Sequence, residues 1–159
     1  MFSAEYRAQL RAELLDYAAN DKRLGGAAIT GSAAVDREDR WSDIDLAFGV
    51  ADPDQVDAVL SDFTRLMYDR HEALHQYDVR AGAWIYRVFF LPGALQVDLA
   101  FVPQTEFRPL GPTFKLIFGN ASPIHQFPPP PAKDIIGLAW LHAVHARTCI
   151  LRGKFWQAE

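Results

Sequence analysis

Two aspartates separated by one residue, Asp43 and Asp45, are the clearest candidates for metal binding or catalysis in this sequence. They lie in segment 43–50, whose alternating start predicts a β-strand. Residues i and i+2 of a strand project from one face, so both carboxylates would lie together while Ile44 and Leu46 point into a core. Like charges on one face repel each other, which makes the pair unfavourable unless a divalent cation lies between or beside them. Carboxylate oxygens suit Mg²⁺ or Mn²⁺.

A third carboxylate, Asp98, stands alone in the apolar segment 95–102, which is also a predicted strand. If this strand neighbours 43–50, then Asp43, Asp45 and Asp98 converge. Three carboxylates support a site for two metal ions of the kind used in phosphoryl or nucleotidyl transfer, with the ions roughly 3.5–4 Å apart. The three aspartates are therefore the predicted catalytic and metal-binding residues, and two Mg²⁺ or Mn²⁺ ions are the predicted cofactors.

Phosphate-binding residues are expected at Gly31-Ser32, where the short apolar segment 24–30, another predicted strand, ends. Glycine lets the backbone approach a phosphate closely, and free N–H groups at the following helix start would bind it. Ser32 adds a hydroxyl donor. Arg37 and Arg40 follow closely and carry the positive charge that would neutralise a triphosphate.

Gly-Ser, ten residues, Asp-x-Asp and a later lone strand Asp together resemble the nucleotidyltransferase superfamily that includes DNA polymerase β. Within it, Arg-Trp-Ser-Asp-Ile-Asp-Leu at 40–46 and Leu-Gln-Val-Asp-Leu at 95–99 are similar to the bacterial small-molecule branch, which contains aminoglycoside and lincosamide adenylyltransferases. The resemblance covers about residues 24–102. The stretch 152–158 is similar to the start of the helical domain that usually follows.

This resemblance implies an α/β (α+β) fold, with a mixed sheet of four or five strands flanked by helices and followed by a helical domain. It implies that Asp43 and Asp45 hold both metals and the nucleotide phosphates. Asp98 would complete the inner metal site and accept the proton of the acceptor hydroxyl. Gly31 and Ser32 would hold the β- and γ-phosphates.

One position departs from the pattern of the family. Many members have Arg-Gly where this chain has Val35-Asp36, so Arg37 or Arg40 would have to replace the missing arginine near the phosphates. Ser42, inside the shared motif, joins these arginines as a predicted nucleotide-binding residue.

The predicted function is metal-dependent transfer of a nucleoside monophosphate, expected to be AMP from ATP, to a hydroxyl of a small molecule, an antibiotic being one candidate. In one alternative the acceptor is a protein, as in antitoxin-like members of the family. In another, which Val35-Asp36 motivates, the chain binds nucleotide without turnover. A template-directed polymerase fits less well, because a net charge of −4 offers no basic groove and no duplex nucleic acid is expected as a partner.

The hydrophobic pattern predicts the elements that must position these residues. Two helices are predicted from apolar residues at helical spacing: 2–19, and a second one that has Asp52 as cap and Pro53 as first residue and runs to about 72. Their apolar stripes are Phe2, Tyr6, Leu10, Leu14 and Tyr17 in the first, and Val56, Val59, Leu60, Phe63, Leu66 and Met67 in the second. Besides the three strands already named, 75–80 and 84–91 are predicted strands, and Pro92-Gly93 joins 84–91 to 95–102 as a hairpin. The frequent prolines and glycines of 103–126 predict irregular structure.

Aromatic residues near the predicted site have two interpretations. Those of strand 84–91 could stack on a base, but their alternation favours a core role. Those of segment 103–126 are candidates for an acceptor or base pocket. The residues of strand 84–91 are Trp84, Tyr86, Phe89 and Phe90, and those of segment 103–126 are Phe107, Phe114 and Phe118.

Segment 1–126 is the predicted catalytic domain, 127–131 a proline spacer, and 132–159 the first helix of a C-terminal helical domain. The helix 133–152 is apolar around much of its circumference. We therefore expect either that the chain is a shortened form of a protein of roughly 250 residues, or that a second chain covers the helix, as in a homodimer. A single cysteine and the lack of a long uncharged apolar run predict a cytoplasmic protein without a membrane partner.

Overall fold

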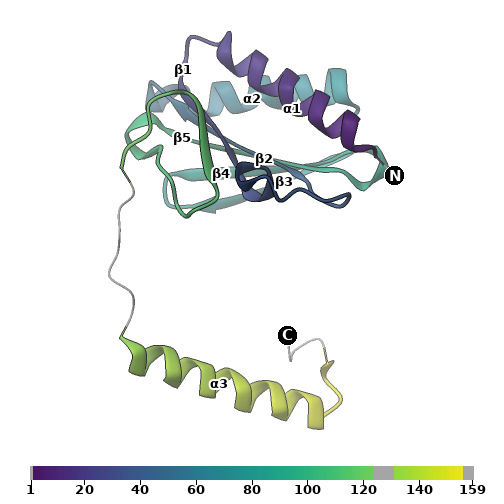
Figure 1. Ribbon diagram of the computed structural model, residues 1–159, viewed down its shortest axis with the longest axis vertical. Coiled ribbons are helices and arrows are strands. Elements are labelled where there is room, and N and C mark those ends of the chain that lie inside the picture. Colours follow the sequence, from purple (N-terminus) through teal and green to yellow (C-terminus); the bar gives the residue numbers. More distant parts are fainter. Residues whose placement is uncertain (1, 124–130, 156–159) are drawn as a thin grey trace. The chain divides into compact units, whose positions relative to one another are not determined.

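Six strands form one mixed sheet in the order β3-β4-β5-β2-β1-β6 (Figure 1). The computed structural model describes residues 2–123 and 131–155, which divide into two compact units, Met1–Ile124 and His125–Glu159. The sheet belongs to the first unit. Its strands are β1 (Leu24–Thr30), β2 (Ile44–Val50), β3 (His75–Ala81), β4 (Trp84–Phe90), β5 (Gln96–Pro103) and β6 (Phe114–Gly119).

The two central strands, β2 and β5, run parallel to each other, and every other neighbouring pair is antiparallel. A parallel pair needs a long crossover connection. Here the connection from β2 to β5 contains the helix α2 (Val56–His71) and the hairpin of β3 and β4. The condition on which the three acids would converge, that segments 43–50 and 95–102 are neighbours, is therefore met.

Two helices, α1 (Ala4–Ala19) and α2, cover the same face of the sheet (Figure 1). The large core lies between them and the sheet, where the Phe48, Phe63 and Phe101 rings pack with centroids 4.9–5.3 Å apart. Strand residues alternate between faces, so Ile44 and Leu46 enter this core as expected. The opposite face carries a smaller apolar cluster that is rich in alanine.

The start of α2 shows how local sequence fixes an element. The Asp52 side chain accepts a hydrogen bond from the N–H of Asp54, as its predicted capping role requires. The first turn, Pro53–Gln55, is a 3-10 helix, and the α-helix begins at Val56. All six apolar residues of the predicted stripe are buried: Val56, Val59, Leu60, Phe63, Leu66 and Met67.

The sheet has six strands, whereas four or five were expected. The additional strand, β6, lies in segment 103–126, which we predicted to be irregular. It is an edge strand that pairs with β1, and most of its side chains are exposed. Edge strands of this kind lack a buried face and therefore give no clear alternation of apolar and polar residues.

The second unit contains one long helix, α3 (Ala132–Leu151), close to the predicted range. Its large apolar side chains are exposed, with Trp140 at 70% and Leu151 at 69%, whereas Cys149 is buried. What covers the exposed side chains stays a prediction. Of the predicted proline spacer, residues 127–130 lie outside the described residues. Among the helices of the described ranges, none combines the length and apolar character that crossing a membrane requires.

Candidate functional site

Two of the three predicted acids lie opposite each other on the central strands of the sheet. Asp45 of β2 and Asp98 of β5 are register partners in the parallel ladder. Register partners on neighbouring strands project from the same face. Ile44 and Val97, the register pair before them, are fully buried on the helix-covered side. The two carboxylates therefore lie on the face that α1 and α2 do not cover, the open face of the sheet.

Asp43 immediately precedes the first residue of β2, because the strand begins one residue later than the predicted start at 43. Its carboxylate acts electrostatically on both other acids: its negative charge raises the pKa of Asp45 and that of Asp98. The structure therefore brings Asp43, Asp45 and Asp98 to one end of the open face.

Gly31 is held against one of these carboxylates. Its φ of +63° lies in the left-handed region, and a Cβ built on it would be 2.0 Å from Oδ2 of Asp45. Both facts exclude any other residue without rearrangement. The turn at Gly31, which opens the 3-10 helix Gly31–Val35, thus packs directly on the acid that the Asp-x-Asp motif contributes to the strand.

The side chains of this region leave hydrogen-bonding capacity unused. Oγ of Ser32 and Oδ1 of Asp98 are buried and make no hydrogen bond within the described residues. Buried polar atoms without a partner are uncommon in proteins and need an explanation. A bound polar or ionic ligand supplies one, and both residues are among those predicted to contact the metal or the phosphates.

The remaining predicted nucleotide-binding residues have other contacts in the structure. The Arg40 guanidinium lies 4.3 Å from the ring centroid of Trp41. Ser42 Oγ accepts a hydrogen bond from the N–H of Asp39, at 2.9 Å, which closes the loop before β2. The N–H of Arg37 donates to the carbonyl of Ser32, at 3.0 Å. Their predicted contacts with phosphate stay predictions.

The electrostatics of the acids are those of a crowded, partly buried group of like charges. Burial, followed by the charges of Asp43 and Asp98, raises the pKa of Asp45 to about 7. Burial, followed by the charge of Asp43, raises the pKa of Asp98 to about 6. No cationic side chain of the described ranges is among the causes of either shift. A bound cation would relieve this unfavourable charge.

The donor chemistry of the three acids fits Mg²⁺ or Mn²⁺, since all three offer carboxylate oxygens. Residues 2–123 and 131–155 contain no group of three His, Cys, Asp or Glu side chains already arranged around a common point for an ion. The carboxylates would therefore have to turn toward a shared ion when it binds. The unpaired Oδ1 of Asp98 is free to do so.

These pKa shifts predict opposite pH dependences for stability and for metal binding. Asp45 and Asp98 have ordinary pKa values near 3.8 when unfolded, and both values are raised in the folded chain. The folded state then binds more protons between about pH 4 and pH 7, so the stability of the metal-free protein should fall as pH rises through that range. Mg²⁺ competes with those protons, so its affinity should rise about tenfold per pH unit for each proton displaced.

Calorimetric titration of Mg²⁺ at pH 5, 6, 7 and 8, with urea unfolding at the same pH values, measures both trends. An Mg²⁺ affinity that does not change between pH 5 and pH 8 would contradict the assignment of Asp45 and Asp98 as ligands.

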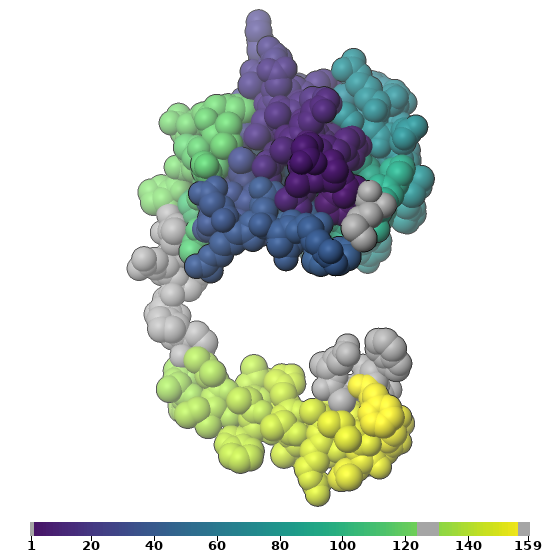
Figure 2. Space-filling view, turned by 45° about the vertical axis from the view of Figure 1, so that its right-hand side comes forward, coloured from purple at the N-terminus to yellow at the C-terminus, as the bar shows by residue number. Residues whose placement is uncertain are grey.

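The sequence reading missed one residue that positions this site, Arg7. The predicted stripe of α1 placed Tyr6 in the core, but Tyr6 is 40% exposed and Arg7 is 5% exposed. A single nitrogen of Arg7, Nη1, donates to the carbonyls of Asp39 and Ser42, both at 2.7 Å. The loop that leads into Asp43 is thereby fixed to α1, and the two segments lie side by side in Figure 2.

Glu38, in the same loop, strengthens this attachment. It forms ion pairs with Nε of Arg7, at 3.1 Å, and with Nη1 of Arg11, at 2.7 Å. The Arg11 hydrogen bond is the largest cause of the lowered pKa of Glu38. An arginine among apolar helix residues carries no sequence signal for partners more than 30 positions away, which is why only the folded chain shows this role.

Replacing Arg7 by alanine should lower the free energy of unfolding by about 2–4 kcal/mol, because Arg7 is itself buried and two carbonyls and Glu38 lose their charged partner. It should also weaken Mg²⁺-ATP binding, since the loop before Asp43 is released. Arg7→Lys keeps the charge without the guanidinium geometry and should recover only part of the stability. Urea unfolding measures the effect. Arg70→Ala, at an exposed arginine of α2, is the control, and equal stability of the Arg7 and Arg70 variants would contradict the positioning role.

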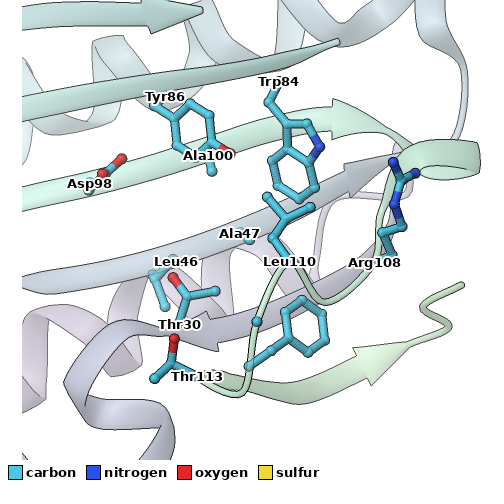
Figure 3. A pocket seen from close by; sticks show the side chains of 12 residues that line it. Thr30, Leu46, Ala47, Trp84, Tyr86, Asp98, Ala100, Arg108, Leu110 and Thr113 are labelled. Carbon is cyan, nitrogen blue, oxygen red and sulfur yellow. The ribbon is translucent and has the colours of Figure 1, made fainter. Parts of the chain in front are cut away.

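The aromatic residues of β4 divide between the two faces of the sheet. Phe89 is fully buried in the large core, as expected, and Phe90 is 39% exposed. Trp84 and Tyr86 lie on the open face, where their rings stack at 5.8 Å and line a cavity that also includes Asp98 (Figure 3). The core interpretation is therefore confirmed for Phe89, wrong for Phe90 and incomplete for Trp84 and Tyr86.

The aromatic residues after β5 also have separate roles. Phe114 lines the same cavity, and Phe107 is fully buried next to Phe114, with the two ring centroids 5.6 Å apart. Phe118 packs on the large core and does not line the cavity.

Comparison with known proteins finds a distant structural similarity and no match in sequence. No protein-family model matches the chain, and no curated protein matches it significantly. Among solved structures, the chain is similar to an aminoglycoside 6-adenyltransferase from Bacillus subtilis, with a TM-score of 0.44 and 15% identity over 91% of this chain and 57% of that one. The chain thus spans little more than half the length of that protein. A similarity of this size establishes neither family nor function, and only the residues of the chain itself can support a proposal.

Proposed function

We propose that the chain is a metal-dependent nucleotidyltransferase, which moves a nucleoside monophosphate, expected to be AMP from ATP, to a hydroxyl of a small molecule. The observation that carries the proposal is the register pairing of Asp45 with Asp98 on the open face, next to Asp43. Carboxylates on the central strands of a sheet are costly for folding and are explained by a function that needs them.

In this proposal Asp43, Asp45 and Asp98 would hold two Mg²⁺ or Mn²⁺ ions. When bound, such ions supply Lewis-acid stabilisation of the charge on the phosphate oxygens. The turn at Gly31 and the unpaired hydroxyl of Ser32 would bind the β- and γ-phosphates. Phosphates held there would leave the α-phosphorus near the carboxylates.

The transfer itself is an in-line displacement. The oxygen of the acceptor hydroxyl forms a bond to the α-phosphorus, the bond from that phosphorus to the bridging oxygen breaks, and pyrophosphate leaves with the electron pair. The hydroxyl proton would pass to the carboxylate of Asp98.

Calorimetric titration of ATP into the protein, with and without Mg²⁺, tests this proposal. We expect binding that requires the metal and is lost in the double variant Asp43→Asn/Asp45→Asn. Metal-independent binding that persists in the double variant would contradict the proposal.

A second candidate is a nucleotide-binding module without turnover. The observation that favours it is the position after the Gly-Ser turn, where Asp36 brings a negative charge and a left-handed φ of 53° while Arg40 stacks on Trp41. Pyrophosphate release distinguishes the candidates. ATP binding without pyrophosphate release across a broad panel of hydroxyl acceptors would favour the module.

A further inference from the structure

A cavity of about 280 Å³ opens on the sheet face that carries the acids, and its lining residues all belong to the first unit (Figure 3). Two alanines, Ala47 of β2 and Ala100 of β5, form its floor. Central strands usually carry bulky branched side chains at such positions. Alanine at both leaves a space that the chain itself does not fill, of the size that a small ring occupies.

The walls of this cavity suit a flat apolar group. Trp84 and Tyr86 stack at 5.8 Å with an interplanar angle of 18°, so they present one continuous aromatic surface. Leu110 and Phe114 come from the segment after β5 and complete the apolar lining. Aromatic surfaces of this kind bind planar rings by stacking.

The lining contains one acidic and one basic residue, Asp98 and Arg108. They lie at opposite sides of the cavity in the view of Figure 3. Nη1 of Arg108 is engaged by Glu106, but Nε and Nη2 make no hydrogen bond within the described residues. A guanidinium with free donors matches a carboxylate, which it can bind through two parallel hydrogen bonds.

The cavity lies on the acceptor side of the proposed reaction. Asp98, the proposed base for the acceptor hydroxyl, lines it. The residues proposed to hold the phosphates, Gly31 and Ser32, do not, and neither do Asp43 and Asp45. A molecule in the cavity would therefore meet the transfer site at Asp98.

We infer that the acceptor is a small planar molecule that carries a hydroxyl at one end and a carboxylate at the other. Its hydroxyl would face Asp98, its ring would lie on Trp84 and Tyr86, and its carboxylate would bind Arg108. Within the lining, a polycationic sugar would meet one acid, Asp98, and the like charge of Arg108. This inference rests on the proposed function, because an acceptor is needed only if the chain catalyses the transfer.

NMR titration of the full, isotope-labelled chain tests the binding part without ATP. The probes are 4-hydroxyphenylacetate, its uncharged counterpart 4-methylphenol, kanamycin and adenosine. The Trp84 indole signal, identified with Trp84→Phe, reports on the cavity. We expect 4-hydroxyphenylacetate to shift this signal and to bind about tenfold more tightly than 4-methylphenol.

Arg108→Gln should remove that preference for the carboxylate, whereas Arg80→Gln, at an exposed arginine of β3, should leave it unchanged. Ala100→Leu should fill the cavity and abolish binding of both phenols, with dispersed amide signals as proof of folding. A preference that survives in Arg108→Gln, tighter binding of kanamycin, or displacement of 4-hydroxyphenylacetate by adenosine would each overturn the inference.

Titration of Mg²⁺-ATP in the same samples separates the two claims. ATP binding without binding of the hydroxyaryl acid overturns the inference alone. Binding of the acid by a protein that does not bind ATP overturns the proposed function and, with it, the role of the acid as acceptor.

Discussion

Replacement of Asp45 by asparagine should lower the rate of pyrophosphate release from ATP about a thousand-fold or more, since several kcal/mol of transition-state stabilisation depend on the bound metal. The same change should raise the thermal stability of the metal-free protein at pH 8. It removes a charge that burial and two neighbouring acids disfavour. After allowance for solvent screening, the gain in the free energy of unfolding should be about 1–2 kcal/mol.

The combination of lost activity and gained stability is what distinguishes a functional carboxylate from a structural one. Asp69→Asn, at an exposed aspartate of α2, is the control and should change neither property. Pyrophosphate release and thermal unfolding measure the two effects on the same samples. An Asp45→Asn protein that is less stable than the wild type would show that this carboxylate supports the fold instead.

Replacement of Gly31 by alanine should abolish Mg²⁺-ATP binding. The added Cβ would lie 2.0 Å from Oδ2 of Asp45, so either the turn or the carboxylate must move. The left-handed backbone adds a cost of about 1–2 kcal/mol. Calorimetry measures the lost affinity, and urea unfolding measures the loss of stability.

Gly82→Ala is a matched control for this experiment. Gly82 has nearly the same backbone angle, with a φ of +61°, but a Cβ there would have no neighbour within 4 Å. Both variants therefore carry the backbone cost, and only Gly31→Ala disturbs the acids. Equal ATP affinity in the two variants would show that the turn at Gly31 does not position the phosphates.

Periodicity predicted the helices and five of the six strands, and it failed at β6. The stripe of α2 was correct at every position, because a helix on a sheet must bury residues at helical spacing. The edge strand β6 was missed, because most of its side chains are exposed and its residues show no clear alternation. It forms by pairing with β1, which lies about 90 residues earlier in the chain.

Residues of the candidate site could be predicted from the sequence where a residue type is unusual for the element that contains it. A charged residue such as Asp98 within an apolar strand is conspicuous in the sequence. Arg7 is not, because an arginine on an amphipathic helix is ordinary and its partners lie in a distant loop. Of the cavity beside Asp98, only Phe114 was among the predicted pocket residues, since its floor depends on which small residues of β2 and β5 become neighbours.

The most direct test of the central claim is a crystal structure of the protein with Mn²⁺ and a non-hydrolysable ATP analogue, with the metal located by its anomalous signal. The account predicts anomalous peaks coordinated by the carboxylates of Asp43, Asp45 and Asp98, with the β- and γ-phosphates at Gly31 and Ser32. Mn²⁺ bound at other residues, or an analogue bound away from the open face of β2 and β5, would contradict it.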